Sequence, residues 1–381
     1  MLFSYQPFPE FAYTSVQQFE NQYIFGRMIR SMHYFSANLL VVMISGHMLR
    51  VFFTTGYKGK RRMNWIVGLC ISGLVLLSCF TGYLLPWDQT AFWAVTICIN
   101  MFDYIPAGSF LKEFFMNGSG VGEKTLQLFF TLHTTLIPSL LILFLTTHFW
   151  KIRKAKGVVT SGLNSINGTD KPVMVAVNPN LLLREVVAAL TVTAVVMTLA
   201  LIFDAPLKEM ANAGLSPNPA KAPWYFAGFQ ELLLHFHPFF AVFIIPITII
   251  SVLIYLPFSK LYIKSEGIWF ISDRAKKAAK TAILISMIVT PLLIVVDEYI
   301  LDFQKWLPDI PLVVSSGLIP FILIFGLFFL LNFGMRQRFK LNQAEAFQTS
   351  VVFLITAFII LTLTCVWLRG PGMKLYFGTG L

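Results

Sequence analysis

The sequence predicts an all-helical bundle of membrane-spanning helices, and three features carry this prediction. Of its 381 residues, 56 % are hydrophobic, and the mean hydropathy is +0.72. Only 12 % are charged, against roughly a quarter in an ordinary soluble domain. The apolar stretches reach the about 20 residues that a hydrocarbon core requires and do not alternate with polar residues as barrel strands do. Eight spans are expected, at 33–54, 65–86, 126–150, 183–203, 236–257, 278–297, 311–334 and 349–368.

Basic residues are unevenly distributed among the connections between these spans. If the connections alternate sides, one side holds 20 of the 29 Lys and Arg residues, including the run KGKRR at 58–62. The positive-inside rule assigns this side to the cytoplasm and both termini to the opposite side. The net charge of +11 then reflects topology and contact with membrane lipid, and nucleic-acid binding is not expected.

The segment before the first span, residues 1–32, reads as an amphipathic stretch lying along the membrane surface. It contains PEFAYTSVQQFENQYIFGRMIR and lacks the basic start and apolar run of a cleavable signal peptide.

The cysteines form no CxxC or CxxCH pattern, so neither a disulfide framework nor c-type haem attachment is signalled. We interpret them as small buried hydrophobes. They are Cys70, Cys79, Cys98 and Cys365.

Four of the six histidines fall on two of the predicted spans. His33 and His47 are 14 residues apart on the first, and His133 and His148 are 15 apart on the third. Both steps are close to four helical turns, so each pair shares one helix face and is separated by about 21 to 22 Å along the axis. The two helices run in the same direction. His33 is therefore level with His133 near the outer side, and His47 with His148 near the cytoplasmic side.

Each level pair of imidazoles can fill both axial positions of a haem iron, which makes a low-spin site suited to electron transfer. A lone intramembrane histidine can equally cap a carbonyl or bond a neighbouring helix, but four at matched depths on two helices favour haem. A metal cluster is disfavoured, because the two levels are too far apart to share an ion and no acidic or thiol ligand lies beside them.

Residues around the histidines are compatible with haem. Arg30 and Arg50 lie within one turn of His33 and His47 and can pair with haem propionates, or simply anchor helix ends. Glycines on the second span can let a flat ring approach the backbone, or merely let helices pack closely. These are Gly68, Gly73 and Gly82.

With these residues, the chain resembles cytochrome b of the quinol-oxidising bc complexes, the family of mitochondrial cytochrome b and of chloroplast cytochrome b6 with its subunit IV. Four stretches carry the resemblance in order: IRSMHYFSANLLVVMISGHMLRVF, GYLLPWDQTAFWAV, LFFTLHTTLIPSLLILFLTTHFWKIRK and KAPWYFAGFQELL. The 15-residue step is typical of the chloroplast and bacterial branch. In the chloroplast branch cytochrome b6 and subunit IV are separate subunits, whereas here the two corresponding parts are joined in one chain. The implied parts are a b6-like region at 33–157, a cytoplasmic linker at 158–182 and a subunit IV-like region at 183–381 with a quinol-site loop at 204–236.

The resemblance implies two non-covalent haems b, the outer held by His33 and His133 and the inner by His47 and His148. It also implies a bifurcated reaction. One electron of quinol passes to a Rieske-type iron-sulfur protein and on to a c-type cytochrome, single or multihaem, while the other crosses the membrane and reduces quinone. The implied setting is a homodimeric complex in the bacterial cytoplasmic membrane that exchanges with the quinone pool and contributes to proton translocation.

The quinol-site signature of the family departs from its usual form. Pro-Glu-Trp-Tyr appears here as Ala222-Pro223-Trp224-Tyr225. The resemblance assigns Pro223, Trp224 and Tyr225 to the quinol site, but a proline cannot take the proton that the family's glutamate takes. Glu231 is the replacement that we expect, with His235 or His237 as alternatives.

Two further regions compare with the family. Arg184 and Glu185 resemble the Lys-Asp pair of the quinone reduction site, although they can equally anchor a helix end. The family's first membrane helix has no counterpart before His33, so that helix is absent, comes from another subunit or is cut off by a misplaced start. In the chloroplast branch that helix carries the cysteine for a covalent extra haem, which is not expected on this chain because no cysteine precedes Cys70.

Two other functions stay open at the level of sequence. One is a diheme, quinone-reactive membrane anchor for another redox module, without a Rieske partner. The other is a transporter in which the histidines relay protons.

Overall fold

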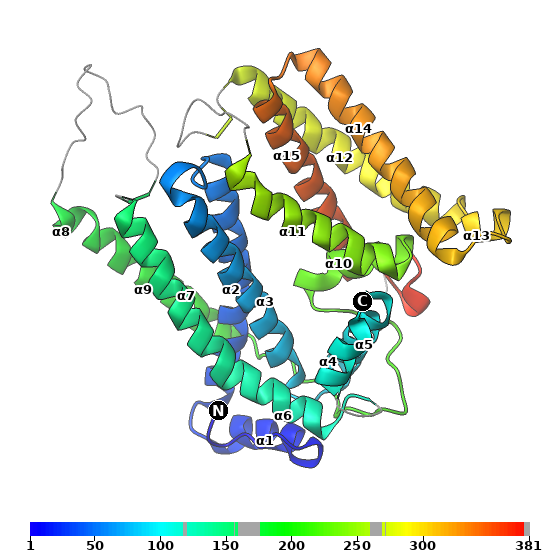
Figure 1. Cartoon of the computed structure of the whole chain (residues 1–381). Coiled ribbons are helices and arrows are strands. Elements are labelled where there is room, and N and C mark those ends of the chain that lie inside the picture. The colour runs from blue at the N-terminus through cyan, green and yellow to red at the C-terminus, as the bar shows by residue number, and fades with distance from the viewer. Residues whose placement is uncertain (117–119, 156, 159–175, 260–268, 271, 377–381) are drawn as a thin grey trace. The chain divides into compact units, whose positions relative to one another are not determined.

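The computed structural model describes residues 1–116, 120–155, 157–158, 176–259, 269–270 and 272–376, and within them the regular secondary structure is helical apart from two isolated β-bridges (Figure 1). The predicted linker at 158–182 lies largely outside the described residues. Eight helices of the described part are long and apolar enough to cross a membrane, which confirms the all-helical, multi-span prediction. They are Gly26–Phe53, Gly59–Leu84, Glu123–Lys154, Val177–Ile202, Phe239–Phe258, Asp273–Tyr299, Val314–Phe339 and Gln343–Leu368.

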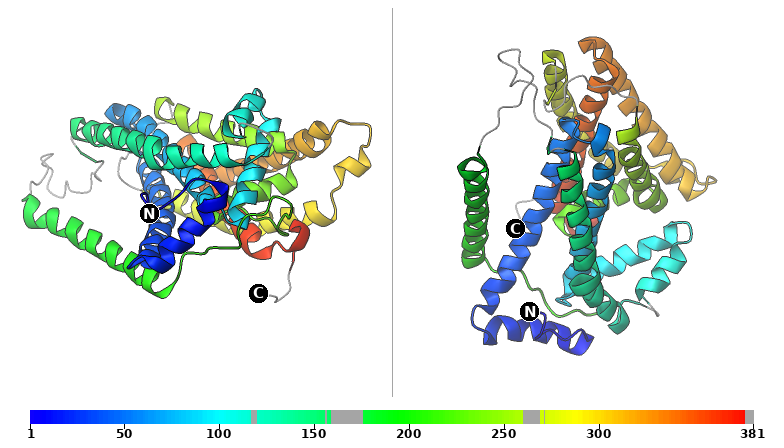
Figure 2. Two further views of the ribbon diagram at one scale, coloured as in Figure 1. Left: turned by 90° about the horizontal axis from the view of Figure 1, so that it is seen from below. Right: turned by 60° about the vertical axis from the view of Figure 1, so that its left-hand side comes forward.

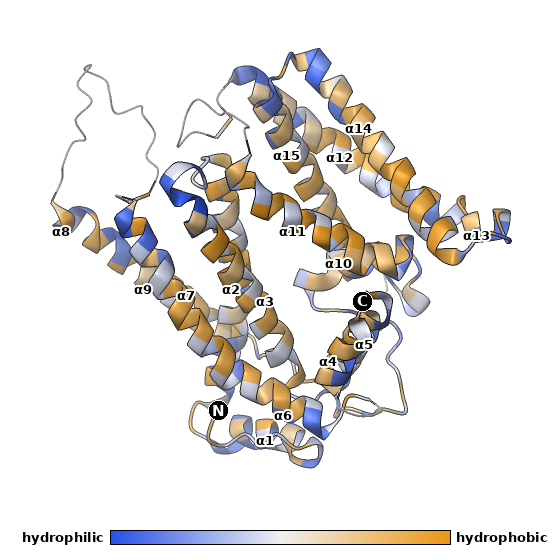
Figure 3. Cartoon of the chain, in the orientation of Figure 1, coloured by the Kyte–Doolittle hydropathy of each residue, from blue (hydrophilic) through white to orange (hydrophobic). Residues whose placement is uncertain are grey.

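The spans carry their apolar side chains outward as well as inward. Figure 3 shows hydrophobic residues along the middle of α12 (Asp273–Tyr299) and α14 (Ile319–Phe339), with polar residues at their ends. Leu201, Ile288 and Leu330 are each exposed by 67 to 70 %. Helices that are apolar all round are stable only where their surroundings are also apolar, so these faces suit lipid tails.

The chain divides into two compact units, of which the first comprises residues 1–52, 63–92 and 118–212. Its helices are α1 (Pro9–Gln22), α2 (Gly26–Phe53), α3 (Arg62–Leu84), α6 (Glu123–Thr131), α7 (Ile137–Lys154), α8 (Val177–Asn180) and α9 (Leu182–Ile202). In this unit α2, α3 and α7 lie side by side (Figure 1).

One turn of π-helix, Leu132–Leu136, joins α6 to α7 without breaking the span. Pro138 is the second residue of α7, which begins directly after this turn. A proline has no N–H to donate and its ring clashes with the carbonyl four residues earlier, so a regular α-helix would be strained here. The wider turn, with its i→i+5 hydrogen bonds, relieves that conflict by taking up one extra residue.

The loop that follows α9 is held against the turn that follows α3. Asp88 and Met210 form an antiparallel bridge. The Gln89 amide donates to the Glu209 carbonyl at 2.8 Å, and the Ala211 amide to the Trp87 carbonyl at 3.0 Å. These backbone bonds fix the first part of the predicted quinol-site loop.

The second unit comprises residues 53–62, 93–117 and 213–381. Its helices are α5 (Gly108–Met116), α10 (Trp224–His235), α11 (Ile245–Tyr255), α12, α13 (Phe303–Trp306), α14 and α15 (Gln343–Leu363), together with most of α4 (Gln89–Asn100). Turns of π-helix precede α11 at Phe239–Ile244 and α14 at Val314–Leu318, and another extends α15 through Thr364–Leu368.

Small residues bring the helices of this unit close together. α12 presents a buried stripe that includes Ala278, Ala282 and Ser286, and the Ser286 hydroxyl donates to the Phe353 carbonyl of α15 at 3.0 Å. Small residues at such contacts let helix backbones approach within a membrane. A β-carbon on Gly228 of α10 would lie 2.7 Å from Phe358 of α15, so α10 also packs tightly on that helix. Figure 2 shows α12, α14 and α15 side by side.

Candidate functional site

The structure brings the four intramembrane histidines together as two facing pairs. The rings of His33 from α2 and His133 from the π-helical turn have their centroids 6.1 Å apart, with 88° between their planes. The rings of His47 from α2 and His148 from α7 are 6.4 Å apart, at 74°. These are the pairs that the sequence predicts to be level.

Both separations fit two imidazoles that share one metal ion. A bond of about 2.0 Å from each nitrogen to a shared ion, with the ring centre about 1.1 Å behind the nitrogen, would put two imidazoles on opposite sides of the ion with their centroids about 6.2 Å apart. If each pair were only two neutral imidazoles in contact, nothing would require both pairs to show nearly the same separation. Among the described residues no group of three or more His, Cys, Asp or Glu could hold an ion, so two-ligand ligation of a haem iron is the chemistry that the donor set supports.

The π-helical turn explains how steps of 14 and 15 residues produce the same level. α2 is an α-helix throughout Gly26–Phe53, with His33 and His47 four turns apart. His133 lies within the π-helical turn at Leu132–Leu136, which consumes one residue more than an α-turn. The extra residue between His133 and His148 is therefore absorbed, and both pairs stay in register.

Ser78 of α3 fixes the tautomer of His133. Nδ1 of His133 lies 3.0 Å from the Ser78 carbonyl oxygen. A carbonyl only accepts, so Nδ1 carries the proton and Nε2 keeps the lone pair that a metal needs, as is usual for histidine ligands. Nδ1 of His148 is buried and has no partner within hydrogen-bond geometry among the described residues.

Two of the three predicted glycines lie against histidine rings. A β-carbon on Gly82 would come within 2.8 Å of Nδ1 of His133, and one on Gly68 within 3.6 Å of Cε1 of His148. A β-carbon on Gly73 would meet nothing within 4 Å. Gly82 is thus needed for the position of His133, Gly68 permits ordinary contact with His148, and the space beside Gly73 is open. The approach of a flat haem ring to these glycines stays a prediction.

The two arginines differ in what they contact. Arg30 is buried, pairs with Glu20, and donates to the carbonyls of Ala205 at 2.9 Å and Pro206 at 2.6 Å. These bonds engage Nη1 and Nη2 in holding α1 and the loop after α9, which favours the structural role of Arg30 over pairing with a propionate. Arg50 is exposed in the last turn of α2, and its pairing with a propionate stays a prediction.

The quinol-site signature lies where α10 begins. Pro223 is the N-cap, Trp224 is the first helical residue and is 39 % exposed, and the half-buried Tyr225 meets the Trp224 ring edge-on at 5.6 Å. Gln230, two turns further on, accepts from the Ala222 amide at 2.7 Å and donates to the Ala220 carbonyl at 2.7 Å. One side chain therefore ties the loop to its own helix.

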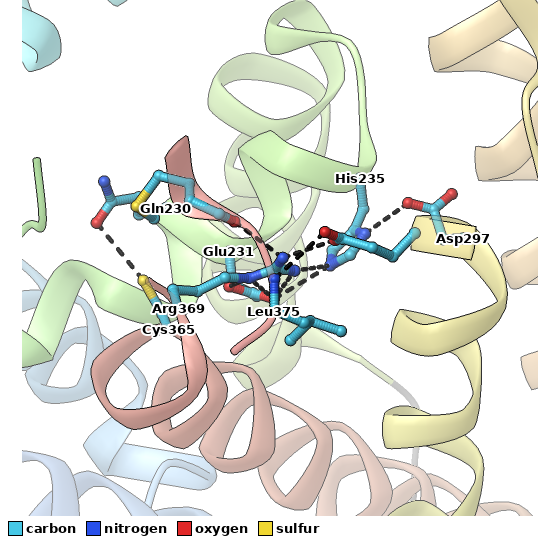
Figure 4. Close-up of polar contacts among 9 residues, drawn as sticks. Gln230, Glu231, His235, Asp297, Cys365, Arg369 and Leu375 are labelled. Carbon is cyan, nitrogen blue, oxygen red and sulfur yellow. Dashed lines mark hydrogen bonds and ion pairs between the residues drawn. The ribbon is translucent and has the colours of Figure 1, made fainter. Parts of the chain in front are cut away.

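Glu231 is fully buried, and both its oxygens are engaged (Figure 4). Arg369 donates to Oε2 at 3.1 Å through Nε and to Oε1 at 2.6 Å through Nη2. Burial alone would raise the pKa of Glu231, but the hydrogen bonds from His235 and Arg369 hold it below its ordinary value. A carboxylate so enclosed is a poor proton acceptor for quinol, which weighs against the prediction that Glu231 replaces the family's glutamate.

His235 belongs to the same cluster as Glu231. Its Nδ1 lies 2.6 Å from Asp297 Oδ2, and its Nε2 lies 3.2 Å from Glu231 Oε1. Burial lowers the pKa of His235, but the bonds to the two carboxylates outweigh burial and raise it to about 9. His235 is therefore a cation near neutral pH and is not available as a base.

His237 is the remaining candidate of the quinol-site loop. It is partly exposed, and burial lowers its pKa, so the ring is neutral near pH 7. Its Nδ1 accepts from the Phe239 amide at 3.3 Å, and its ring meets Tyr104 edge-on at 5.7 Å.

Arg184 and Glu185 lie in the first turn of α9, and both are exposed. Neither makes an ion pair within the described part of the chain. Their position suits either a quinone site or a helix anchor.

Comparison with known proteins gives concordant results for the histidine-bearing part. The family model described as cytochrome b/b6/petB matches residues 1–156. Cytochrome b6 of Cyanidium caldarium is 41 % identical over 155 residues, which cover 40 % of this chain and 72 % of the relative. Cytochrome b6 of Heliomicrobium gestii is 40 % identical over 154 residues, covering 40 % and 72 %.

The fold similarity extends further along the chain. A chain of the solved structure titled "Hyperthermophilic respiratory Complex III" superposes with a TM-score of 0.66 at 21 % identity, covering 94 % of this chain and 86 % of that chain. This result shows a shared fold across both units.

Proposed function

The chain belongs to the cytochrome b/b6 family, and on that premise we propose that it is the diheme subunit of a quinol-oxidising complex. Its role is to move electrons across the membrane between a quinol oxidation site outside and a quinone reduction site inside. The observation that carries the proposal is the pair of facing histidine couples, at 6.1 and 6.4 Å between ring centroids.

Four residues would hold the two haems b without covalent attachment. His33 and His133 ligate the outer haem, and His47 and His148 the inner one. A haem held by two imidazoles supplies a one-electron couple with no open position for a substrate. The Ser78 carbonyl keeps Nε2 of His133 free to bind the iron, and this fixed tautomer strengthens the ligand.

The outer quinol site would lie in the loop at 204–236, with Trp224 and Tyr225 in contact with quinol. Pro223 fixes the start of α10, because its φ is preset and it lacks an N–H that would need a partner. We assign the proton-accepting role to Nδ1 of His237, because the ring is partly exposed and, within the described part of the chain, this nitrogen is engaged only by the Phe239 amide at 3.3 Å, a bond that protonation would replace. One electron of the quinol would pass to a Rieske-type iron-sulfur protein and on to a c-type cytochrome.

The inner quinone site would involve Arg184 and Glu185, with Arg50 near the same membrane face. The chain would lie in a bacterial cytoplasmic membrane, and the distribution of basic residues supports both termini outside. Residues 33–157 then form the b6-like part and residues 183–381 the subunit IV-like part, in a complex that is a homodimer and contributes to proton translocation.

A second candidate is a diheme anchor that exchanges electrons between quinone and another redox module without a Rieske partner. It is favoured by the proline at position 223 together with the enclosure of Glu231 by Arg369, which leave the family's usual carboxylate base without a direct substitute.

Purification of the complex from native membranes distinguishes the two functions. A copurifying Rieske-type protein, together with quinol:cytochrome c reductase activity, supports the proposal. A multihaem or molybdenum partner in a complex that lacks the Rieske protein supports the anchor instead.

A further inference from the structure

The chain folds back on itself after its last span. The segment from Arg369 to Leu375 closes through an antiparallel bridge between these two residues. Gly370 donates its amide to the Lys374 carbonyl at 2.9 Å, and Gly372 has a φ of +64° that suits glycine. We call residues 365–375 the terminal brace.

The terminal brace bonds to the quinol-site loop on both sides of Trp224 and Tyr225. Before them, Asn218 accepts from the Gly372 amide at 2.5 Å, and Lys221 donates to the Val366 carbonyl at 2.9 Å. After them, Gln230 accepts from the Cys365 thiol at 3.5 Å, and Glu231 pairs with Arg369 at 2.6 Å. These contacts hold the loop and α10 at both ends of the signature.

Arg369 is the centre of this arrangement, as Figure 4 shows. Its side chain is fully buried between two carboxylates. One edge of the guanidinium meets both oxygens of Glu231. The other edge donates through Nη1 to Glu298 of α12 at 2.6 Å and to the Met373 carbonyl at 3.0 Å. Only a planar guanidinium reaches such partners at the same time, because a lysine ammonium is a single point of charge.

We propose that Arg369 is a positioning residue for quinol oxidation, which sets the place of the Trp224-Tyr225 signature by joining α10 to α12 and the terminal brace. The inference rests on the proposed function and adds to it a residue 144 positions beyond Tyr225.

A role in positioning α10 and its loop explains this cluster better than a contribution to folding stability alone does. Buried ion pairs contribute little net stability compared with well-packed apolar side chains, whereas breaking one by removing a partner is strongly destabilising. The cluster does fix the orientation of α10 and of the loop before it. Glu231 and Gln230 are neighbours on α10, and Arg369 holds Glu231 while Gln230 holds the loop. A displacement of about 1 Å at a reacting centre can lower a rate by about a hundredfold.

The test compares three variants of the full complex in native membranes: Arg369→Gln, Arg369→Lys and Lys374→Gln. Lys374 is exposed in the same brace and serves as the matched control. Quinol oxidation is measured per assembled haem, with separate kcat and KM, alongside the dithionite-reduced spectrum of both haems. We expect Arg369→Lys to assemble with an unaltered spectrum and to lose about tenfold or more in kcat, and Lys374→Gln to match the parent.

A merely structural role for Arg369 would reduce the amount of assembled complex and leave kcat per haem unchanged. Parental kcat in Arg369→Lys overturns the inference, and this variant decides the matter if Arg369→Gln does not assemble. Failure of the proposed function is a separate result, since the parent complex itself would then show dithionite-reducible haems that quinol does not reduce.

Discussion

The imidazole of His133 lies against the backbone of Gly82, at a place where a β-carbon would come within 2.8 Å of Nδ1. The same nitrogen donates to the Ser78 carbonyl, one turn earlier on α3. α3 therefore gives His133 both a hydrogen bond that selects its tautomer and the space to reach that bond. A single helix that contributes no ligand sets the geometry of the outer pair.

Gly82→Ala is expected to remove the outer haem and spare the inner one. The new methyl group would occupy the position of the His133 ring, which must then turn away from His33. Haem content should fall from two to one per chain, measured by spectroscopic quantification of the purified protein. Gly326→Ala in α14 is the control, since a methyl group there meets nothing within 4 Å. Two retained haems in Gly82→Ala would contradict the packing argument.

His148→Leu is expected to lose the inner haem alone. His33 and His133 keep their ring separation of 6.1 Å in a part of the bundle about 21 Å away along the axis. Quinol should still reduce the remaining haem, while electron transfer to quinone at the inner site stops. Redox difference spectra of membranes check this outcome, and retention of both haems would overturn the ligand assignment.

Deleting Thr135 is expected to leave both haems bound. Thr135 lies in the π-helical turn. Its removal lets this turn become α-helical, at the cost of the strain that Pro138 adds, and leaves the histidines 14 positions apart, as on α2. Deleting Val42 from the regular helix α2 should instead rotate His47 by about 100° relative to His33 and release haem. Haem quantification of the two deletion variants separates them, and equal losses would refute the account of the register.

The ion cluster around His235 should stabilise the protein most at mildly acidic pH. The pKa of His235 is raised from 6.5 to about 9, so its stabilisation is complete below about pH 6.5 and is lost as the pH rises through about 9. The pKa of Glu231 is lowered, so its stabilisation is present above its ordinary pKa of about 4.5 and is lost in more acidic solution.

Thermal unfolding of the parent and of His235→Gln between pH 6 and pH 10 checks the cluster. The difference in unfolding temperature should be largest near pH 6 and should shrink toward pH 10. A difference that grew with pH would show that His235 is held neutral in the fold.

The spans and the histidine pairs could be predicted because each depends on a local, periodic pattern. A step of 14 residues keeps His33 and His47 on one face of α2 whatever surrounds them. The 15-residue step from His133 to His148 works only because of the π-helical turn before Pro138, a detail that spacing alone leaves open.

The roles of Arg30 and Glu231 could not be predicted in the same way. Arg30 is satisfied by carbonyls at 205 and 206 and Glu231 by Arg369, partners more than 130 residues away. Such contacts leave no periodic signal in the sequence. One sign was available in the sequence: an arginine stands directly after an apolar span, in WLRGPGMK. Such an arginine suggests a carboxylate partner buried near the end of that span.

The haem content of the purified parent protein tests the central claim most directly. Two facing histidine pairs predict two haems b per chain, with a b-type band at about 560 nm after reduction, part of which appears when quinol is added without dithionite. One haem per chain, none, or a spectrum that requires an open axial position would contradict the assignment of both pairs.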